Sequence, residues 1–143
     1  MHAKRTDPTA AYRKVGLESQ LDAASPHKLI LMLFEGAQLA VSDAQRHMAA
    51  NDVANKGKSI SRCIEIIDSG LQASLDLEGG GELAMRLNAL YDYMGRRLLH
   101  ANAKNDAAAL QEVQALLSEL RSAWENIAAD PAVLSSNKGR QDV

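Results

Sequence analysis

The sequence contains few aromatic residues and few prolines. Aromatic residues make up 3% of the 143 residues, and the chain has 3 prolines. Aromatic and β-branched residues favour strands, whereas alanine, leucine, glutamate and lysine, which are plentiful here, favour helices. The composition therefore predicts an all-α protein of one ordinary domain.

The chain has a single cysteine, Cys63. No internal disulfide can form, and a lone cysteine inside an apolar helical pattern is typical of a buried thiol in a reducing compartment. We expect Cys63 to be an unreactive core residue.

Targeting and membrane segments are also missing from the sequence. Its first residues, MHAKRTDPTAAYRKVG, carry basic charge without an apolar region of roughly 7 to 15 residues, so they do not resemble a secretory signal. No apolar run approaches the roughly 18 residues of a membrane span. A net charge of -2 gives no overall attraction for nucleic acid or anionic lipid. We expect a cytoplasmic protein without membrane insertion or nucleic-acid binding.

Motifs for catalysis or for metal and cofactor binding are incomplete. Gly57-Lys58-Ser59 matches the end of a phosphate-binding loop, but the leading glycine of that motif is replaced by Asp52. None of the glutamates has a histidine three residues later, as a di-iron bundle needs, and the scattered histidines show no zinc spacing. We expect surface histidines, no enzyme activity, no cofactor and no metal.

Apolar residues recur at helical spacing in four segments separated by short polar or glycine-rich breaks. Ser25-Pro26 is typical of a helix start, and Asp130-Pro131 of a helix end. Short connections make consecutive helices antiparallel, so the pattern predicts an up-down four-helix bundle at residues 25–130. Residues 1–24 are expected to form an N-terminal arm or short helix packed on the bundle, and residues 131–143 a mobile tail. The expected helices are Pro26–Met48, Val53–Leu77, which EGGGE would end, Glu82–Asn102 and Ala107–Ala129.

Apolar residues also occur outside the expected inward stripes. At 100° per residue from Leu29, the stripe lies between roughly 0° and 100°, whereas Leu31 falls near 200° and Phe34 near 140°. The same count, made from Val53 in the second expected helix and from Leu83 in the third, both taken as inward-facing, places Ile66, Met85 and Leu99 outside their stripes. Scattered exposed apolar residues are normal in proteins, and a docked arm carrying Tyr12, Val15 and Leu17 could cover some of them. The surplus also suits the binding of an amphipathic peptide.

Several stretches together resemble one family. ASPHKLILMLFEGA at residues 24–37, IIDSGL at 66–71, LYDYMGRRLLHANAKND at 90–106 and AW at 123–124, with AY at 11–12 upstream, resemble the FliS family of flagellin-specific export chaperones. The resemblance covers roughly residues 10–128. It implies a bundle that binds the C-terminal segment of newly made flagellin in the cytoplasm, prevents early polymerisation and presents it to the flagellar export gate.

The resemblance also implies a client-binding role for Tyr12, although a purely structural role is the alternative. Tyr91 lies on the inward stripe and is expected in the core, whereas Tyr93 is expected to face outward as the likelier client contact. Gly95 departs from the bulkier residue expected before the arginine pair. The client-binding surface is expected to comprise Tyr12, Val15, Leu17, Leu31, Phe34, Ile66, Met85, Tyr93 and Leu99.

Two other functions are compatible with the same pattern. The spare apolar surface could serve self-association, for example as a homodimer, or the bundle could be a regulatory adaptor that binds another flagellar export component. Copurification with flagellin that depends on the flagellin C-terminal segment would distinguish client binding from self-association.

Overall fold

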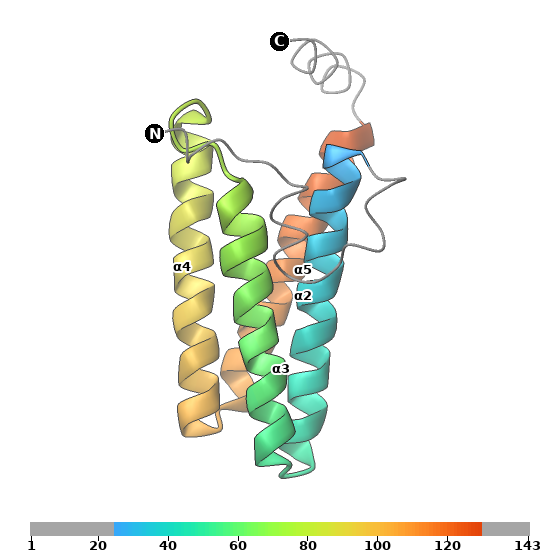
Figure 1. Cartoon of the computed structure of the whole chain (residues 1–143), viewed down its shortest axis with the longest axis vertical. Coiled ribbons are helices and arrows are strands. Elements are labelled where there is room, and N and C mark those ends of the chain that lie inside the picture. The colour runs from blue at the N-terminus through green and yellow to red at the C-terminus, as the bar shows by residue number, and fades with distance from the viewer. Residues whose placement is uncertain (1–24, 130–143) are drawn as a thin grey trace.

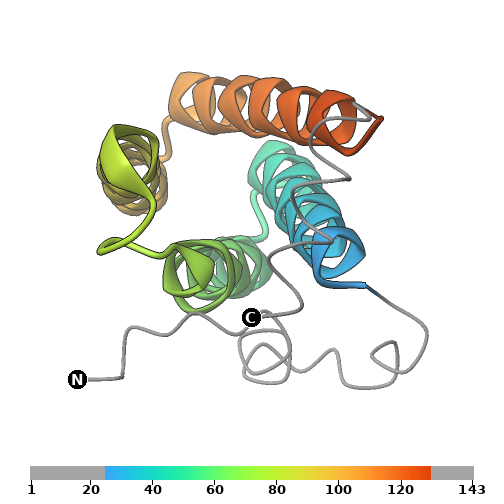
Figure 2. The same cartoon turned by 90° about the horizontal axis from the view of Figure 1, so that it is seen from above.

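The computed structural model describes residues 25–129, which form an antiparallel helical bundle (Figure 1). The chain runs along the bundle axis in α2, returns in α3, and repeats this path in α4 and α5. Seen along the axis, α2 lies between α3 and α5 (Figure 2). This arrangement confirms the predicted up-down bundle. The long helices are α2 (Pro26–Ala49), α3 (Val53–Glu65), α4 (Gly81–Lys104) and α5 (Ala107–Ala129).

Side-chain caps fix three of the helix starts. The Ser25 hydroxyl accepts a hydrogen bond from the Lys28 amide at 3.1 Å, with Pro26 in the first turn of α2. Asp52 caps α3 by accepting from the Asn55 amide at 3.2 Å. Asp106 caps α5 by accepting from the amides of Ala108 and Ala109. Each cap satisfies amides that have no partner within the helix.

The second predicted helix is not α-helical to its end. After Glu65 the chain continues as a π-helical segment, η3 (Ile66–Leu71), and a 3₁₀ turn, η4 (Gln72–Ser74). A β-carbon on Gly70 would lie 2.9 Å from Leu33 Cδ2, so glycine permits this close approach to α2. The glycines of EGGGE were expected to end this helix, but Gly80 and Gly81 instead precede and begin α4.

The core is built mainly from aliphatic side chains of α2, α3, η3, α4 and α5. Cys63 is fully buried, and its thiol donates to the Ala37 carbonyl at 3.5 Å. Tyr91 is also buried, as expected. Both predictions of core positions are therefore confirmed.

Phe34 lies in this core, and the prediction that it faces away from the core is wrong. It is 3% exposed. Because α2 packs against α3, η3 and α5 together, its buried arc is wider than the stripe of a helix with one neighbour. Val41, about 120° from Leu29 by the same count, is buried for the same reason.

Ile66 is also a core residue, with 0% exposure, so the prediction that it points outward is wrong. Its direction was measured from Val53, which is 71% exposed at the start of α3 and lies at the margin of the buried arc. Measured from the buried Ile60, Ile66 falls at about 240°, next to Cys63 at about 300°. Leu83 was likewise expected to face inward, but it is exposed in the first turn of α4.

Polar contacts connect neighbouring helices outside the core. Gln38 of α2 donates to Ser118 of α5 at 3.1 Å and accepts from Arg121 at 3.0 Å. Lys56 of α3 is 5% exposed, and its ammonium group donates to the Asn102 carbonyl at 3.1 Å and to Asn105 Oδ1 at 2.9 Å. Lysine is favourable there because a cation complements the C-terminal dipole of α4. Lys56 therefore joins the first turn of α3 to the last turn of α4.

Candidate protein-binding surface

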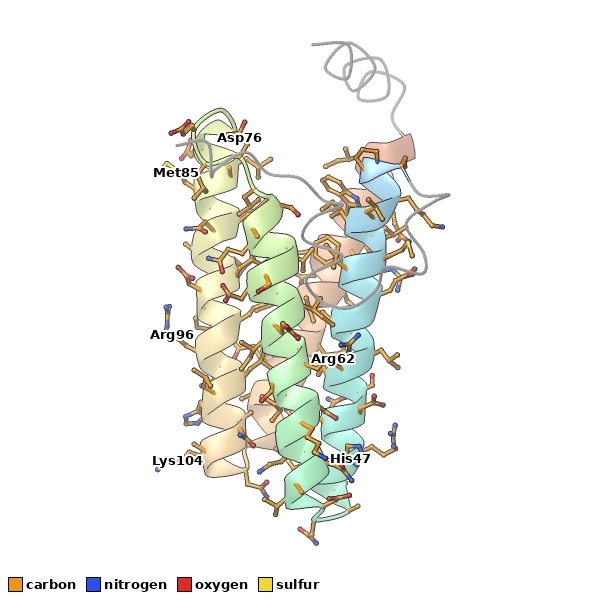
Figure 3. All side chains as sticks on the ribbon, in the orientation of Figure 1. His47, Arg62, Asp76, Met85, Arg96 and Lys104 are labelled. Carbon is orange, nitrogen blue, oxygen red and sulfur yellow. The ribbon has the colours of Figure 1, made fainter. Side chains whose placement is uncertain are left out.

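Met85 and Leu99 are exposed apolar residues on the outer face of α4. Met85 is 65% exposed and Leu99 is 60% exposed. Figure 3 shows Met85 projecting away from the bundle. The predicted outward direction of both side chains is confirmed. Fourteen positions separate them, so they lie about 21 Å apart along the helix.

Leu31 occupies an intermediate environment on α2. Its neighbours Ile30 and Met32 pack against the core cluster as partly buried side chains. Leu39, further along α2, is exposed and was not selected from the sequence. The outer side of α2 therefore adds apolar area to that of α4.

Tyr93 does face away from the core, but its hydroxyl group is engaged. It donates to Glu112 of α5, which also accepts from Arg97 Nε at 2.7 Å. The carboxylate of Glu112 raises the pKa of the Tyr93 hydroxyl, and the Tyr93 and Arg97 donors lower the pKa of Glu112. Tyr93 thus joins α4 to α5, and its side chain is only partly exposed.

The contact between His27, at the start of α2, and Trp124, near the end of α5, was not predicted from the sequence. The rings of His27 and Trp124 stack with their centroids 4.4 Å apart, and Trp124 Nε1 donates to the His27 carbonyl at 3.0 Å. His27 Nε2 is buried without a hydrogen-bond partner, and burial lowers the pKa of the imidazole. His27 is therefore not the surface residue we expected. The two residues are far apart in sequence, so no local pattern indicates their contact.

The remaining predicted contacts, Tyr12, Val15 and Leu17, lie outside residues 25–129. The structure brings Met85 and Leu99 onto one helix face and places Leu31 on another helix. It removes Phe34 and Ile66 from the surface. Within residues 25–129, no group of three histidine, cysteine or carboxylate side chains could hold a metal ion, and no helix is long and apolar enough to cross a membrane.

The surface thus consists of exposed apolar side chains on helices that polar contacts hold together. This arrangement defines a helical protein-binding module. Such surfaces bind other polypeptides through apolar burial.

The comparisons with known proteins identify the family. The family model described as "Flagellar protein FliS" matches residues 8–131, so the chain belongs to the FliS family of flagellar secretion chaperones. The Flagellar secretion chaperone FliS of Salmonella typhimurium is 52% identical over 117 residues, covering 82% of this chain and 87% of that protein. The Escherichia coli protein of the same name is 43% identical, covering 88% of this chain and 93% of its own length.

A third relative is the Flagellar secretion chaperone FliSB of Pseudomonas aeruginosa. It is 43% identical over 116 residues, which cover 81% of this chain and 91% of that protein. These relatives confirm the resemblance that the sequence motifs indicate. As a member of this family, the protein is a flagellar secretion chaperone that binds flagellar export substrates.

Proposed function

We propose that the protein binds the C-terminal segment of flagellin in the cytoplasm, prevents its premature polymerisation and delivers it to the flagellar export gate. The observation that carries this proposal is the exposure of Met85 and Leu99 in a member of the FliS family. The core is complete without these side chains. A segment that covers them gains apolar burial worth about 1.5 to 3 kcal/mol for each large side chain.

The client contacts are proposed to be Leu31, Met85, Leu99 and the partly exposed Tyr93, with Tyr12, Val15 and Leu17 from the N-terminal region. Ordering a disordered segment costs several kcal/mol, so useful affinity requires contacts on more than one helix. Exposed positions on both α2 and α4 suit a segment that wraps around the bundle.

Copurification tests the identity of the client. The protein is co-expressed with its cognate flagellin, either intact or without the C-terminal segment. Intact flagellin should copurify and truncated flagellin should not. Equal copurification of both forms would contradict the proposal, and concentration-dependent sedimentation without flagellin would instead support self-association.

Two variants test the surface. Met85→Ser with Leu99→Ser should weaken binding of a flagellin C-terminal peptide by at least about tenfold in titration calorimetry. The matched control is Leu83→Ser, because Leu83 is 64% exposed on the same helix but points about 160° away from Met85. If the control variant loses as much affinity as the double variant, the proposed surface is wrong.

A further inference from the structure

Charged residues are distributed unequally along the bundle axis. We define the basic half as residues 43–62 and 93–118, which contain seven lysines and arginines and four carboxylates. The acidic half, residues 25–42, 63–92 and 119–129, has nine carboxylates and three lysines and arginines. The small net charge of the chain conceals this separation.

The carboxylates of the basic half all have partners nearby. Asp43 pairs with Arg46 at 3.0 Å, and Asp52 caps α3. Asp106 caps α5 and contacts His100 at 3.1 Å, while Glu112 binds Tyr93 and Arg97. All four carboxylates are therefore already engaged, and Asp52 also interacts electrostatically with Lys58.

Three cationic side chains of the basic half have no such hydrogen-bond or salt-bridge partner among residues 25–129. Lys58, Arg96 and Lys104 are exposed, and among residues 25–129 the side chain of none of them makes a hydrogen bond or a salt bridge. Figure 3 shows Arg96 and Lys104 projecting from the outer side of α4. Their charge is therefore available to a partner.

Two exposed apolar side chains lie on the seam between α3 and α4 in this half. A β-carbon on Gly57 would lie 3.9 Å from Asn102 Oδ1, so these residues face each other across the seam. Val53 lies one turn before Gly57, and Leu99 lies one turn before Asn102 on the antiparallel helix. Val53 and Leu99 are thus separated by about 10 Å along the axis, or roughly two helical turns.

The surface is depressed between Val53 and Leu99. Gly57 has no side chain, and the buried Lys56 holds the two helices together beneath it. An open hollow on α3 begins at this point; it is lined by Ala54, Gly57, Lys58, Ser61, Arg62 and Glu65. We call the whole surface the basic seam; it comprises Val53, Gly57, Lys58, Arg96, Leu99 and Asn102. Lys104 lies on the α5 side of α4, in the direction of Tyr93 and Arg97, and is not part of it.

We propose that the basic seam binds an acidic amphipathic helix of a partner protein. Apolar side chains two turns apart on that helix cover Val53 and Leu99, and carboxylates on its flanks pair with Lys58 and Arg96. Charge complementarity selects this partner over a basic segment, and it makes association faster at low salt. Leu99 also belongs to the proposed client surface, so the two partners compete there. The cations do not belong to that surface, so the proposal can be tested separately from the proposed function.

The test uses fluorescence anisotropy with two labelled helical peptides of about 18 residues. Both carry leucines two turns apart, but one has glutamates on its flanks and the other has lysines. The glutamate peptide should bind the full-length protein at least about tenfold more tightly than the lysine peptide, and raising the salt concentration should weaken it.

Charge reversal locates the site. The double variant Lys58→Glu with Arg96→Glu should lose binding of the glutamate peptide by at least about tenfold, because each change replaces attraction with repulsion. Lys28→Glu, an exposed change in the acidic half, is the control and should bind normally. Circular dichroism checks that the variants are folded.

Three results would overturn the proposal: equal affinity for the two peptides, undiminished binding by the double variant, or binding to phosphatidylglycerol vesicles in place of the glutamate peptide. A flagellin C-terminal peptide measured with the same double variant separates the two hypotheses. Its binding should be largely retained if the cations serve only the acidic partner. Loss of the acidic peptide alone leaves the proposed client function intact.

Discussion

Phe34 and Leu99 are large apolar residues that the helical count places outside the expected stripes, yet their environments differ. Phe34 is buried and Leu99 is exposed. Phe34→Ala should lower the free energy of unfolding by about 3 to 5 kcal/mol through cavity formation, whereas Leu99→Ala should change it by less than about 0.5 kcal/mol. Urea denaturation measures both. Similar losses would show that Leu99 also contributes to the core.

The burial of His27 makes stability depend on pH. Burial lowers the pKa of His27 in the folded protein, so the unfolded chain binds a proton more readily. The contribution of this site is fully present above the ordinary histidine pKa of about 6.5 and is lost as pH falls through the lower folded value. Thermal unfolding between pH 7.5 and 5 should show this loss, and His27→Gln should reduce it. An unchanged pH profile in the variant would show that other groups cause it.

Residue positions could be predicted from the sequence where a helix has a simple environment. The outward directions of Met85 and Leu99 were predicted because the angle along an uninterrupted helix is regular. The prediction for Phe34 was wrong because the width of the buried arc of a helix depends on how many helices surround that helix. The prediction for Ile66 was wrong because its reference residue, Val53, lies at the margin of the buried arc. Neither the number of neighbouring helices nor the margin of the arc can be read from the local sequence.

Two glycines within helices have opposite surroundings. A β-carbon on Gly95 would meet nothing within 4 Å, whereas one on Gly70 would lie 2.9 Å from Leu33. Gly95→Ala should stabilise the protein by about 0.5 to 1 kcal/mol through lower helix entropy cost. Gly70→Ala should destabilise it by about 1 to 3 kcal/mol, because it overpacks the core. Chemical denaturation of the pair tests the difference in sign. A stabilised Gly70→Ala variant would mean that Leu33 moves freely.

Helix boundaries were predicted closely where capping residues are present. Ser25, Pro26 and Asp106 mark their helix starts in the sequence, and each start is found within a residue of the expected position. The end of the second helix was not predicted. Gly70 packs closely against Leu33 within its π-helical segment η3, and periodicity alone cannot distinguish such a segment from a regular helix.

Cys63 reports on the whole bundle because it is buried among several helices. Burial raises the pKa of its thiol to about 12, so almost no reactive thiolate exists at neutral pH. Labelling by a disulfide reagent should therefore proceed only through large-scale opening, at a rate that approaches the unfolding rate measured by circular dichroism. Rapid labelling under native conditions would show that α3 opens independently.

The separation of charge also bears on how the whole molecule behaves outside any complex. Its net charge of -2 suggests weak retention on ion-exchange resins. Yet the resin interacts with the local charge at one end of the molecule rather than with its net charge. Close to neutral pH and at low ionic strength, the protein should adhere to both cation and anion exchangers, presenting a different end to each.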